Sequence, residues 1–568
     1  IRRPPRSTRK ESSAASDVYK RQETYPEIYN HWELKFEKNT AFLIMKVDED
    51  KGFFEGYKLK LNSYDIGVDI ELSDAVQRLR FEHPQISSII IKSGNEKAFC
   101  AGANIKMLAS SDHAHKVNFC KFTNETRNFL ENSSKEASQF FICLVEGVCA
   151  GGGYELALAC DHIILLDDGS SSISLPEVPL LAVLPGTGGL TRLTDKRKIR
   201  RDLADVFCTM EEGVKAKKAK EWRLVDTITK KTSLNDELNS LIKNKSCNKN
   251  QNENLVGVQL NNLQKTTVSN EEITYSTLSV QIDREKKSAT ITINAPLEDA
   301  PENLSEILSQ GDDFWLLKCA RELDDTILNL RFNELEIGII VFKTSGEISK
   351  VLSYDKLFET YKNFWLMNEI SYFWTRVFKR IDLTSRTLIT LIEPNSCYAG
   401  FLSELIFAAD RSYMAEGEFE EYDNKKATII LSKSNFGIFL MSNNMSRLDT
   451  RFIGLPEQIL LVKQNLEKQI LAEEANDLGL ITFMFDDIDW EDEIRIFLEE
   501  RSSFSPDSMV GMESNLRFPG KETMETKIFG RLSAWQNWIF QRPSAVGENG
   551  ALKKYGTGNK GQYTKERT

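Results

Sequence analysis

The feature that most constrains the fold of this chain is a motif that occurs twice. "CAGGGYELALACD" covers residues 149–161, and "YAGFLSELIFAAD" covers residues 398–410. When the motifs are aligned, 249 residues apart, Glu155 falls on Glu404. Self-similarity of this kind indicates an internal duplication. We therefore expect two copies of one structural unit in series.

The segments around each motif repeat as well. An apolar run precedes each copy, at residues 140–147 and 387–394. An earlier apolar run, "ISSIIIKSG" (86–94), is matched by "IGIIVFKTS" (337–345), and an alternating segment around Lys38-Asn39 is typical of a β-hairpin. Strands that alternate with helices favour stacked α/β units. The sequence therefore predicts an α/β fold built from a duplicated unit.

Changes in composition predict where the units begin and end. Residues 229–270 are rich in Asn, Lys and Ser and have little periodicity, which favours a helix end followed by a linker. Residues 1–22 are rich in Arg and Ser and resemble translated adaptor sequence, so we interpret them as an artefact; a transit peptide is the alternative. The predicted divisions are a first unit at 23–245, a linker at 246–270, a second unit at 271–500 and a helical C-terminal extension at 501–568.

Composition excludes several classes of protein. Hydrophobic residues make up 41% and charged residues 28%, and no apolar run approaches the roughly 20 residues of a membrane span, so we expect a soluble protein without membrane contact. The net charge of −11 argues against nucleic-acid binding. Nine scattered cysteines without a CxxC pair favour a reduced, cytoplasmic compartment. His113 and His115 are the only close histidines, and their spacing does not share a helix face, so we predict no metal site.

The glycine triplet ahead of Glu155 suggests a site for negative charge. The start of a helix leaves backbone N–H groups unpaired, its dipole favours anions, and glycine lets a ligand approach the backbone closely. A tight packing turn is the alternative for the triplet alone. Two more loops surround it in the sequence, "KAFCAGANI" (97–105) and "SLPEVPLLAVLPGTGGLTRL" (174–193). A charged residue at the head of an apolar helix is costly to bury unless something uses it.

Together these three loops resemble the crotonase (enoyl-CoA hydratase/isomerase) superfamily. The resemblance implies an oxyanion hole for the thioester oxygen of an acyl-CoA, formed by the backbone N–H groups of Ala103 and Gly152. It also implies that Glu155 and Glu177 are the catalytic carboxylates. Prearranged N–H donors stabilise the charge that develops on that oxygen, and buried glutamates with pKa values near neutrality can move protons.

The same resemblance implies contacts with the substrate. Asn104 stands where the superfamily more often has aspartate, which leaves its role open. The basic segments 194–202 and 215–223 are candidates for CoA phosphates, although charged helix faces are usually solvated. The expected substrate- and CoA-binding residues are Lys97, Ala101, Lys106, Gly151 and Gly153.

The duplication and the tail "KETMETKIFGRLSAWQNWIFQRPSAVGENGALKKYGTG" (521–558) make the chain most similar to the benzoyl-CoA-dihydrodiol lyase family. This similarity implies opening of 2,3-epoxybenzoyl-CoA by two waters to 3,4-dehydroadipyl-CoA semialdehyde and formate, with no cofactor, in a homodimer. The implied fold is a pair of crotonase-like (ββα) spiral domains with a C-terminal helical tail. In the second domain, Gly400-Phe401-Leu402 replaces the triplet, so we expect a degenerate scaffold in which Glu404 is structural.

Two other functions remain open at this point. A hydratase or isomerase acting on another unsaturated acyl-CoA would need the same glutamates and oxyanion hole, but not a duplicated chain. A non-catalytic acyl-CoA-binding scaffold would be favoured by a broken first site, whereas Gly152, Glu155 and Glu177 are all present.

Overall fold

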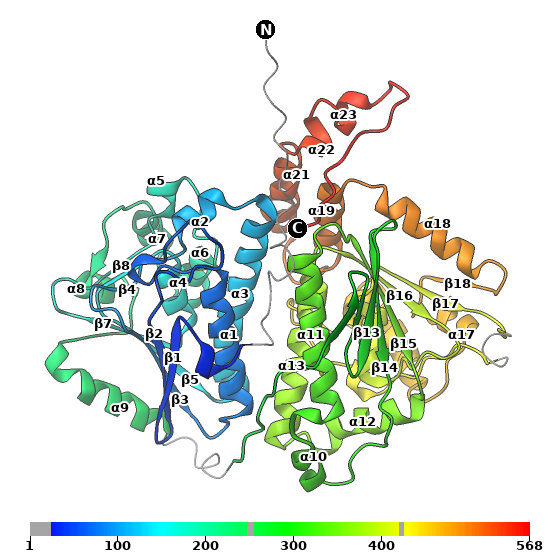
Figure 1. Ribbon diagram of the computed structural model, residues 1–568, viewed down its shortest axis with the longest axis horizontal. Helices are drawn as coiled ribbons and strands as arrows, with labels where there is room; N and C mark the ends of the chain where they lie inside the picture. The colour runs from blue at the N-terminus through cyan, green and yellow to red at the C-terminus, as the bar shows by residue number, and fades with distance from the viewer. Residues whose placement is uncertain (1–23, 247–254, 420–424) are drawn as a thin grey trace.

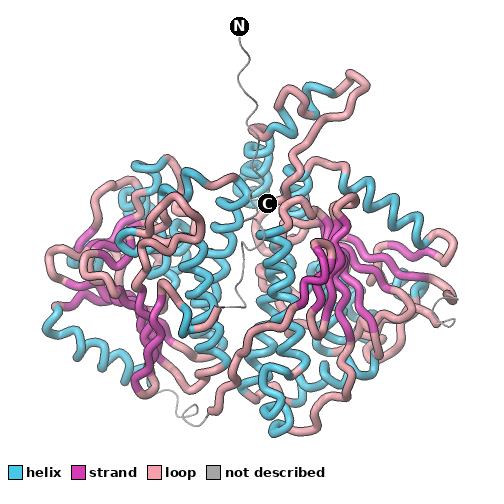
Figure 2. Tube along the Cα trace, in the orientation of Figure 1, coloured by secondary structure: helices cyan, strands magenta, loops and turns pink. Residues whose placement is uncertain are grey.

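The computed structural model describes residues 24–246, 255–419 and 425–568, so the predicted artefact at 1–22 lies outside the described residues. Two α/β halves lie side by side, and a helical tail lies at the top between them (Figure 1). The sheets lie toward the outer sides, and long helices of both halves meet in the middle (Figure 2). These central helices are α1 (Ile66–Phe81), α3 (His113–Glu136), α11 (Trp315–Asn333) and α13 (Trp365–Leu383).

The first half is built on a six-stranded sheet. Its first two strands form the antiparallel hairpin predicted around Lys38-Asn39, and the other neighbours in the sheet are parallel. Ile, Leu and Val dominate the central strands, which suits burial on both faces by helices. The strand order is β1 (Trp32–Glu37), β2 (Thr40–Met45), β3 (Ser88–Ser93), β5 (Phe140–Val145), β7 (His162–Leu166) and β10 (Thr227–Thr229).

A smaller sheet in the first half brings the three sequence loops together. It has the order β4 (Ala98–Cys100), β6 (Val148–Ala150), β8 (Ser172–Ser174) and β9 (Val214–Lys215), and β4, β6 and β8 are parallel. Each of these three strands leads toward a short helix: α2 (Ile105–Ser110), α4 (Gly152–Ala159) and α5 (Glu177–Leu181). Because parallel strands end at one edge, the three loops meet there.

The second half repeats this strand arrangement. An antiparallel hairpin is again followed by parallel strands, after two additional strands at the edge. The order is β11 (Thr266–Ser269), β12 (Glu272–Thr274), β13 (Leu278–Asp283), β14 (Ser288–Asn294), β15 (Ile339–Ser345), β16 (Thr387–Ile392), β17 (Arg411–Ala415) and β18 (Phe483–Phe485). In place of the smaller sheet, the described residues of this half form isolated bridges, Ala399–Ile430, Phe419–Lys425 and Ile429–Ile470.

The described part of the predicted linker contacts the first half and contains a β-strand. The amide of Val258 donates a 2.7 Å hydrogen bond to the carbonyl of Phe81, which ties this segment to the first half. Strand β11 then lies inside the range predicted as linker, because the second half gains an edge hairpin that the duplication does not include. The exact domain boundaries stay predictions.

Buried ion pairs join the two halves. Arg331 of α11 donates two hydrogen bonds, of 2.8 and 2.7 Å, to the carboxylate of Glu125 on α3. Arg80 of α1 makes an ion pair of 2.6 Å with Glu369 on α13. A buried charge of this kind needs its partner, because an unpaired charge away from water is strongly destabilising. The halves are therefore fixed to each other by specific pairs as well as by apolar packing.

The C-terminal region is helical, as predicted, and part of it lies against the first half. The ring of Trp538 stacks on His113 of α3, with centroids 5.6 Å apart. The helices of this region are α18 (Trp490–Ser502), α19 (Pro506–Leu516), α20 (Met524–Lys527), α21 (Ser533–Ile539), α22 (Pro543–Val546) and α23 (Ala551–Lys554).

Shorter helices cover the sheets. In the first half these are α6 (Gly189–Thr191), α7 (Arg201–Cys208), α8 (Ala216–Glu221) and α9 (Leu234–Ser246). In the second half they are α10 (Leu304–Gln310), α12 (Ile348–Thr360), α14 (Glu404–Ala408), α15 (Arg447–Arg451), α16 (Pro456–Gln464) and α17 (Ala472–Asp477). Across the described ranges, none of the helices has the length and apolar character that crossing a membrane requires.

Candidate active site

Glu155 lies in the first turn of α4, and its side chain is buried. The amide of Gly189 donates a 2.8 Å hydrogen bond to its Oε1 atom. Burial raises the pKa of Glu155, while this hydrogen bond and the charge of Arg127 oppose the rise. A carboxyl group in this setting holds its proton more tightly than one in water, which is what a general acid or base near neutrality requires.

Glu177 begins α5 and reaches the glycine turn from the neighbouring strand. Burial raises the pKa of Glu177 to about 7, and the charge of Glu155 contributes to the rise. A Cβ atom on Gly151 would lie 2.8 Å from Oε1 of Glu177, so the carboxylate sits directly over that glycine. Among the described residues, Oε2 of Glu177 has no hydrogen-bond partner. The two glutamates therefore flank the same turn, and one of them has a buried oxygen free for a ligand.

The backbone geometry leaves the amide of Ala103 unpaired. Ala103 forms a parallel bridge with Tyr64, in which Tyr64 donates to the carbonyl of Gly102 at 3.0 Å and receives a bond from the amide of Asn104 at 2.8 Å. Backbone N–H groups alternate in direction along an extended segment, so the Ala103 amide points away from Tyr64. Within the part of the chain that the structure describes, this amide donates to no protein acceptor.

The amide of Gly152 is the first of α4 and is likewise without an acceptor among the described residues. Gly102, next to Ala103, packs against this turn: a Cβ on Gly102 would lie 3.2 Å from the nitrogen of Gly152. A helix start that offers a free N–H beside a second free N–H can stabilise an oxyanion. The structure thus brings the segments that carry Ala103 and Gly152 together at one edge.

Steric constraints explain why glycine is present at each position of the triplet. Gly151 has φ +55°, a conformation that residues with a side chain rarely adopt. A Cβ on Gly152 would fall 2.0 Å from the hydroxyl oxygen of Tyr64, and one on Gly153 would fall 2.7 Å from the carbonyl oxygen of Cys100. The turn is therefore packed so closely that none of the three positions accepts a larger residue without movement.

The loop after β4 borders an open pocket of about 680 Å³. Ala101, Ala103 and Lys106 line it, as do Lys58 and Lys60 from the preceding segment. Lys97, which was expected at the same place, does not line this pocket. Lys58 is paired with Asp50 at 2.6 Å, so Lys60 and Lys106 supply the local positive charge, which suits a phosphate-bearing ligand in a chain that is acidic overall.

The structure explains Asn104, whose role the sequence left open. Its side-chain oxygen accepts a 3.0 Å bond from the amide of Met107, which caps α2, and its side-chain nitrogen donates to the carbonyl of Lys58 at 2.8 Å. Asn104 therefore fixes the loop that carries Ala103. In the basic segment 194–202, Arg197 is paired with Asp226 and Arg200 with Asp202, and in segment 215–223 Lys215 donates to the carbonyl oxygen of Gly169.

Sequence reasoning did not identify the residues that hold the glutamates in place. Arg192 donates to the carbonyl of Thr187 at 2.9 Å and to Glu131 on α3, and so fixes the turn whose Gly189 amide binds Glu155. The pair Gly188-Gly189 in "PGTGG" could have indicated this turn, because adjacent glycines often mark one. In the structure Gly188 has φ +84°. The partners on α3 are far away in sequence, and no local pattern indicates them.

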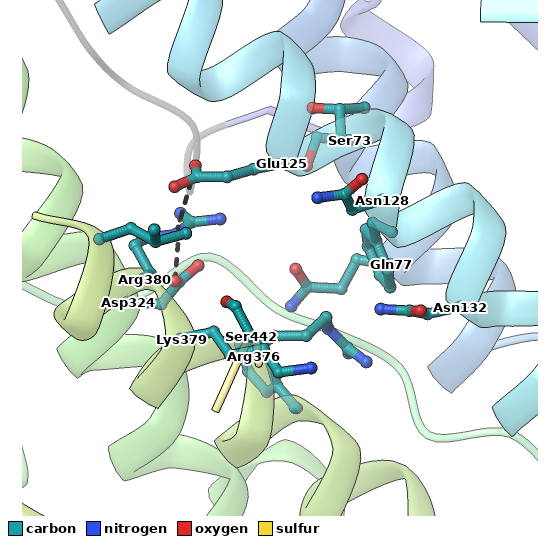
Figure 3. Close-up of a pocket in the computed structure, with 14 residues that line it drawn as sticks. Ser73, Gln77, Glu125, Asn128, Asn132, Asp324, Arg376, Lys379, Arg380 and Ser442 are labelled. Carbon is teal, nitrogen blue, oxygen red and sulfur yellow. Dashed lines mark ion pairs between the residues drawn. The ribbon is translucent and has the colours of Figure 1, made fainter. Parts of the chain in front are cut away.

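A second, more enclosed cavity lies between the two halves, away from the glutamates. Figure 3 shows Arg380 between Glu125 and Asp324, and its ion pairs measure 3.6 and 3.1 Å. The cavity holds only about 80 Å³. It is too small for an acyl-CoA, and four of its charged residues, Glu125, Asp324, Arg376 and Arg380, already have partners, so we interpret it as part of the joint between the halves.

The histidine pair considered in the sequence takes part in aromatic packing. His113 stacks on Trp538, and His115 lies 6.4 Å from Phe119 in a stacked arrangement, centroid to centroid. Among the described residues, no group of three or more His, Cys, Asp or Glu side chains is placed to hold a metal ion.

The chain is similar to known proteins over the segments that form this site. Residues 58–290 match the family model described as enoyl-CoA hydratase/isomerase, a range that includes both glutamates and both amides. The chain is 49% identical over 540 residues to the benzoyl-CoA-dihydrodiol lyase of Aromatoleum evansii, covering 95% of this chain and 96% of that protein.

Two further similarities involve part of the chain. The fatty acid oxidation complex subunit alpha of Aliivibrio fischeri is 31% identical over 159 residues, which cover 28% of this chain and 23% of that protein. A solved enoyl-CoA hydratase from Geobacillus kaustophilus aligns with 38% of this chain and 74% of its own, at 31% identity and a TM-score of 0.33.

Proposed function

This chain belongs to the benzoyl-CoA-dihydrodiol lyase family and is a lyase of the crotonase superfamily, and we propose that it opens the ring of 2,3-epoxybenzoyl-CoA. With two waters the products are 3,4-dehydroadipyl-CoA semialdehyde and formate, so atoms balance without an oxidant or reductant. The observation that carries the proposal is the meeting of two buried glutamates and two unpaired amides at one turn, in a chain so similar to a named lyase over its whole length.

The amides of Ala103 and Gly152 would hold the thioester carbonyl oxygen. As water adds to the ring or the ring carbon–carbon bond breaks, electrons move onto that oxygen, and N–H donors fixed in advance stabilise the charge. Each such donor contributes roughly 10²–10³-fold to the rate in other acyl-transfer sites. Both amides lack acceptors among the described residues, which supports this role.

Glu155 and Glu177 would share the proton transfers. Burial raises the pKa of both, and mutual repulsion adds to the rise at Glu177. Two coupled carboxyl groups of this kind favour one proton between them, so that one acts as acid and the other as base. Protonation of the epoxide oxygen and activation of water then fall to the pair, with the free Oε2 of Glu177 available to a water.

The segment after Glu177 favours a substrate with an apolar acyl group. Five apolar side chains within seven positions are exposed there, which forms an apolar patch: Val178, Leu180, Leu181, Val183 and Leu184. An aromatic acyl group beside the glutamates would cover part of this surface. A cytoplasmic homodimer, with no cofactor beyond the CoA of the substrate, completes the proposal.

Formate release from 2,3-epoxybenzoyl-CoA tests the function directly. The purified chain should release one formate for each substrate consumed, and Glu155→Gln and Glu177→Gln should each abolish most of this activity. Glu404→Gln is the matched control, because Glu404 holds the equivalent position in the second half and is paired with Arg447 at 3.0 Å. Ring opening that survives both first-half substitutions would refute the site assignment.

Hydration of another unsaturated acyl-CoA is the second candidate. It is favoured by the match of the first half to the enoyl-CoA hydratase/isomerase family. Crotonyl-CoA hydration measured beside formate release separates the two: turnover of crotonyl-CoA without formate from the epoxide would favour the hydratase.

A further inference from the structure

The second half contains the counterpart of the glycine turn, and its first glycine has a similar φ. Gly400 has φ +50° where Gly151 has +55°. The amide of Gly400 donates to the carbonyl of Ile430 at 2.9 Å, just as the amide of Gly151 donates to Ser174 at 2.9 Å. The next residue, Phe401, therefore stands in the place of Gly152, and its amide is the counterpart of the proposed oxyanion donor.

The other donor loop is missing from the second half. In the first half, a long loop between Ser93 and Ile105 contains β4 and brings Gly102 and Ala103 to the turn. In the second half, β15 ends at Ser345 and α12 begins at Ile348, so only two residues separate them. Helix α12 occupies the vacated side of the turn.

Asp355 of α12 fills the resulting space. One of its carboxylate oxygens, Oδ1, accepts a 2.8 Å hydrogen bond from the amide of Phe401 and a 2.6 Å bond from the hydroxyl of Ser434. A Cβ on Gly400 would fall 2.3 Å from the carboxyl carbon of Asp355, so the group lies directly against the turn. The carboxylate thus sits where an oxyanion bound to the equivalent amide of the first half would sit.

Among the described residues, no cation pairs with this carboxylate. Asp355 is buried, and its partners there are neutral donors. Neutral donors alone, one backbone N–H and a hydroxyl, satisfy its Oδ1, which is how an oxyanion hole holds its ligand. Burial without a cation raises the pKa of Asp355, while the bonds from Phe401, Ser432 and Ser434 oppose the rise.

The remaining parts of the turn are also closed to a substrate. The Phe401 ring packs against Trp374 and Phe358, with centroids 4.8 and 5.7 Å away. The bridge of Ala399 with Ile430 matches the pairing of Ala150 with Ser174, so Lys433 stands where the first half has Glu177. Lys433 is exposed, so no carboxylate reaches the turn from the position that corresponds to Glu177.

We propose that the second half retains a carboxylate-binding site and that the chain fills it permanently with its own Asp355. The ligand class of this site is a small carboxylate, held by the Phe401 amide and the Ser434 hydroxyl. Occupation from within makes the second half a rigid partner for the catalytic half and excludes acyl-CoA from it. This inference is independent of which acyl-CoA the first half uses.

Removal of the internal ligand tests the proposal. Asp355→Ala leaves a space beside the Phe401 amide, so the melting temperature should fall and should then rise with added sodium acetate or formate more than that of the wild type. Sodium chloride at equal ionic strength and the neutral isostere acetamide should not produce this rise. Asp355→Asn fills the space and keeps an acceptor. Its melting temperature should therefore fall less than that of Asp355→Ala and should show no specific response to carboxylates.

If Asp355→Ala does not fold unaided, refolding from denaturant with acetate, acetamide or chloride gives the same comparison through the yield of native protein. Recovery specific to carboxylates supports the proposal. An Asp355→Ala variant as stable as the wild type, or one that carboxylates help no more than chloride does, would overturn it. These measurements use no substrate, so their result does not depend on whether the proposed reaction occurs.

Discussion

Oε1 of Glu177 lies 2.8 Å from the position that a Cβ on Gly151 would occupy. One of the two proposed catalytic acids is therefore held against the backbone turn that begins α4, the helix that carries the other. The glycine at that point has two functions: it adopts a positive φ, and it leaves room for the carboxylate.

Gly151→Ala should lower kcat by about 10²-fold, since displacement of a reacting group by about 1 Å has a cost of that order. The new methyl group would push the Glu177 carboxylate aside and strain the turn. Steady-state formate release measures the loss. Gly454→Ala, where no atom lies within 4 Å of the added Cβ, is the control and should retain full activity. Equal rates for both variants would show that the contact does not matter.

The Glu177 carboxyl group should make the native protein less stable as pH rises. Its pKa is raised from 4.5 to about 7, so folding favours the protonated form. The native state has no penalty from this group below about pH 4.5, and the penalty grows to about 3 kcal/mol above pH 7. Glu177→Gln should therefore be more stable than the wild type at pH 8 and equally stable at pH 4.5. Denaturant unfolding at the two pH values checks this, and a pH-independent difference would contradict it.

The same group should appear in the kinetics. The profile of kcat/KM reports pKa values of the free enzyme, so it should bend near pH 7 as Glu177 titrates. If Glu177 acts as base, the rate rises through this pH, and if it acts as acid, the rate falls. The direction of the bend therefore assigns its role. A flat profile between roughly pH 6 and 8 would exclude Glu177 from proton transfer in the rate-limiting step.

Lys106→Ala should raise KM with little change in kcat, because Lys106 lines the open pocket beside the oxyanion loop, where the CoA phosphates are expected. The effect should weaken as salt is added, since exposed charges are screened. Lys97→Ala is a matched control from the same loop that does not line the pocket, and its KM should stay near the wild-type value. A larger effect at Lys97 would place the nucleotide elsewhere.

Arg331→Ala should destabilise the junction of the halves by about 3 kcal/mol, because the buried Glu125 carboxylate loses two hydrogen bonds and keeps only the longer ion pair with Arg380, of 3.6 Å. Arg200→Ala removes an exposed pair with Asp202 and should have almost no effect. Thermal unfolding followed by calorimetry compares the two. Similar stabilities for both variants would show that Glu125 is satisfied in another way.

Local patterns were sufficient for much of the fold. The strands β3, β5, β15 and β16 and the first hairpin are where the apolar runs and the Lys38-Asn39 turn predicted them, because strand formation depends on patterns within a few residues. The strand orders of the two sheets also agree with the predicted duplication. The edge strands β11 and β12 were missed: β11 lies within the segment predicted as a linker, and β12 is a short strand that follows it directly.

The candidate site was also predicted only in part. Family motifs placed Glu155, Glu177, Ala103 and Gly152, and the structure gathers their segments at the ends of three parallel strands, while the catalytic roles remain predictions. The motifs did not indicate Arg192 or Tyr64, which support the site through contacts between segments far apart in the chain. They also predicted CoA contacts for Lys97 and Lys106; of the two, only Lys106 lines the open pocket, and the contacts themselves remain predictions.

By itself, the sequence determined that the chain is a duplicated α/β protein with one intact set of loops and one altered set, because glycines, carboxylates and apolar periodicity are local properties of the chain. Only the tertiary structure decided what the altered set contains. Asp355 and Phe401 are 46 positions apart, and their contact depends on a shortened loop that lets α12 reach the turn. Such a contact depends on the path of the whole backbone, which no local pattern specifies.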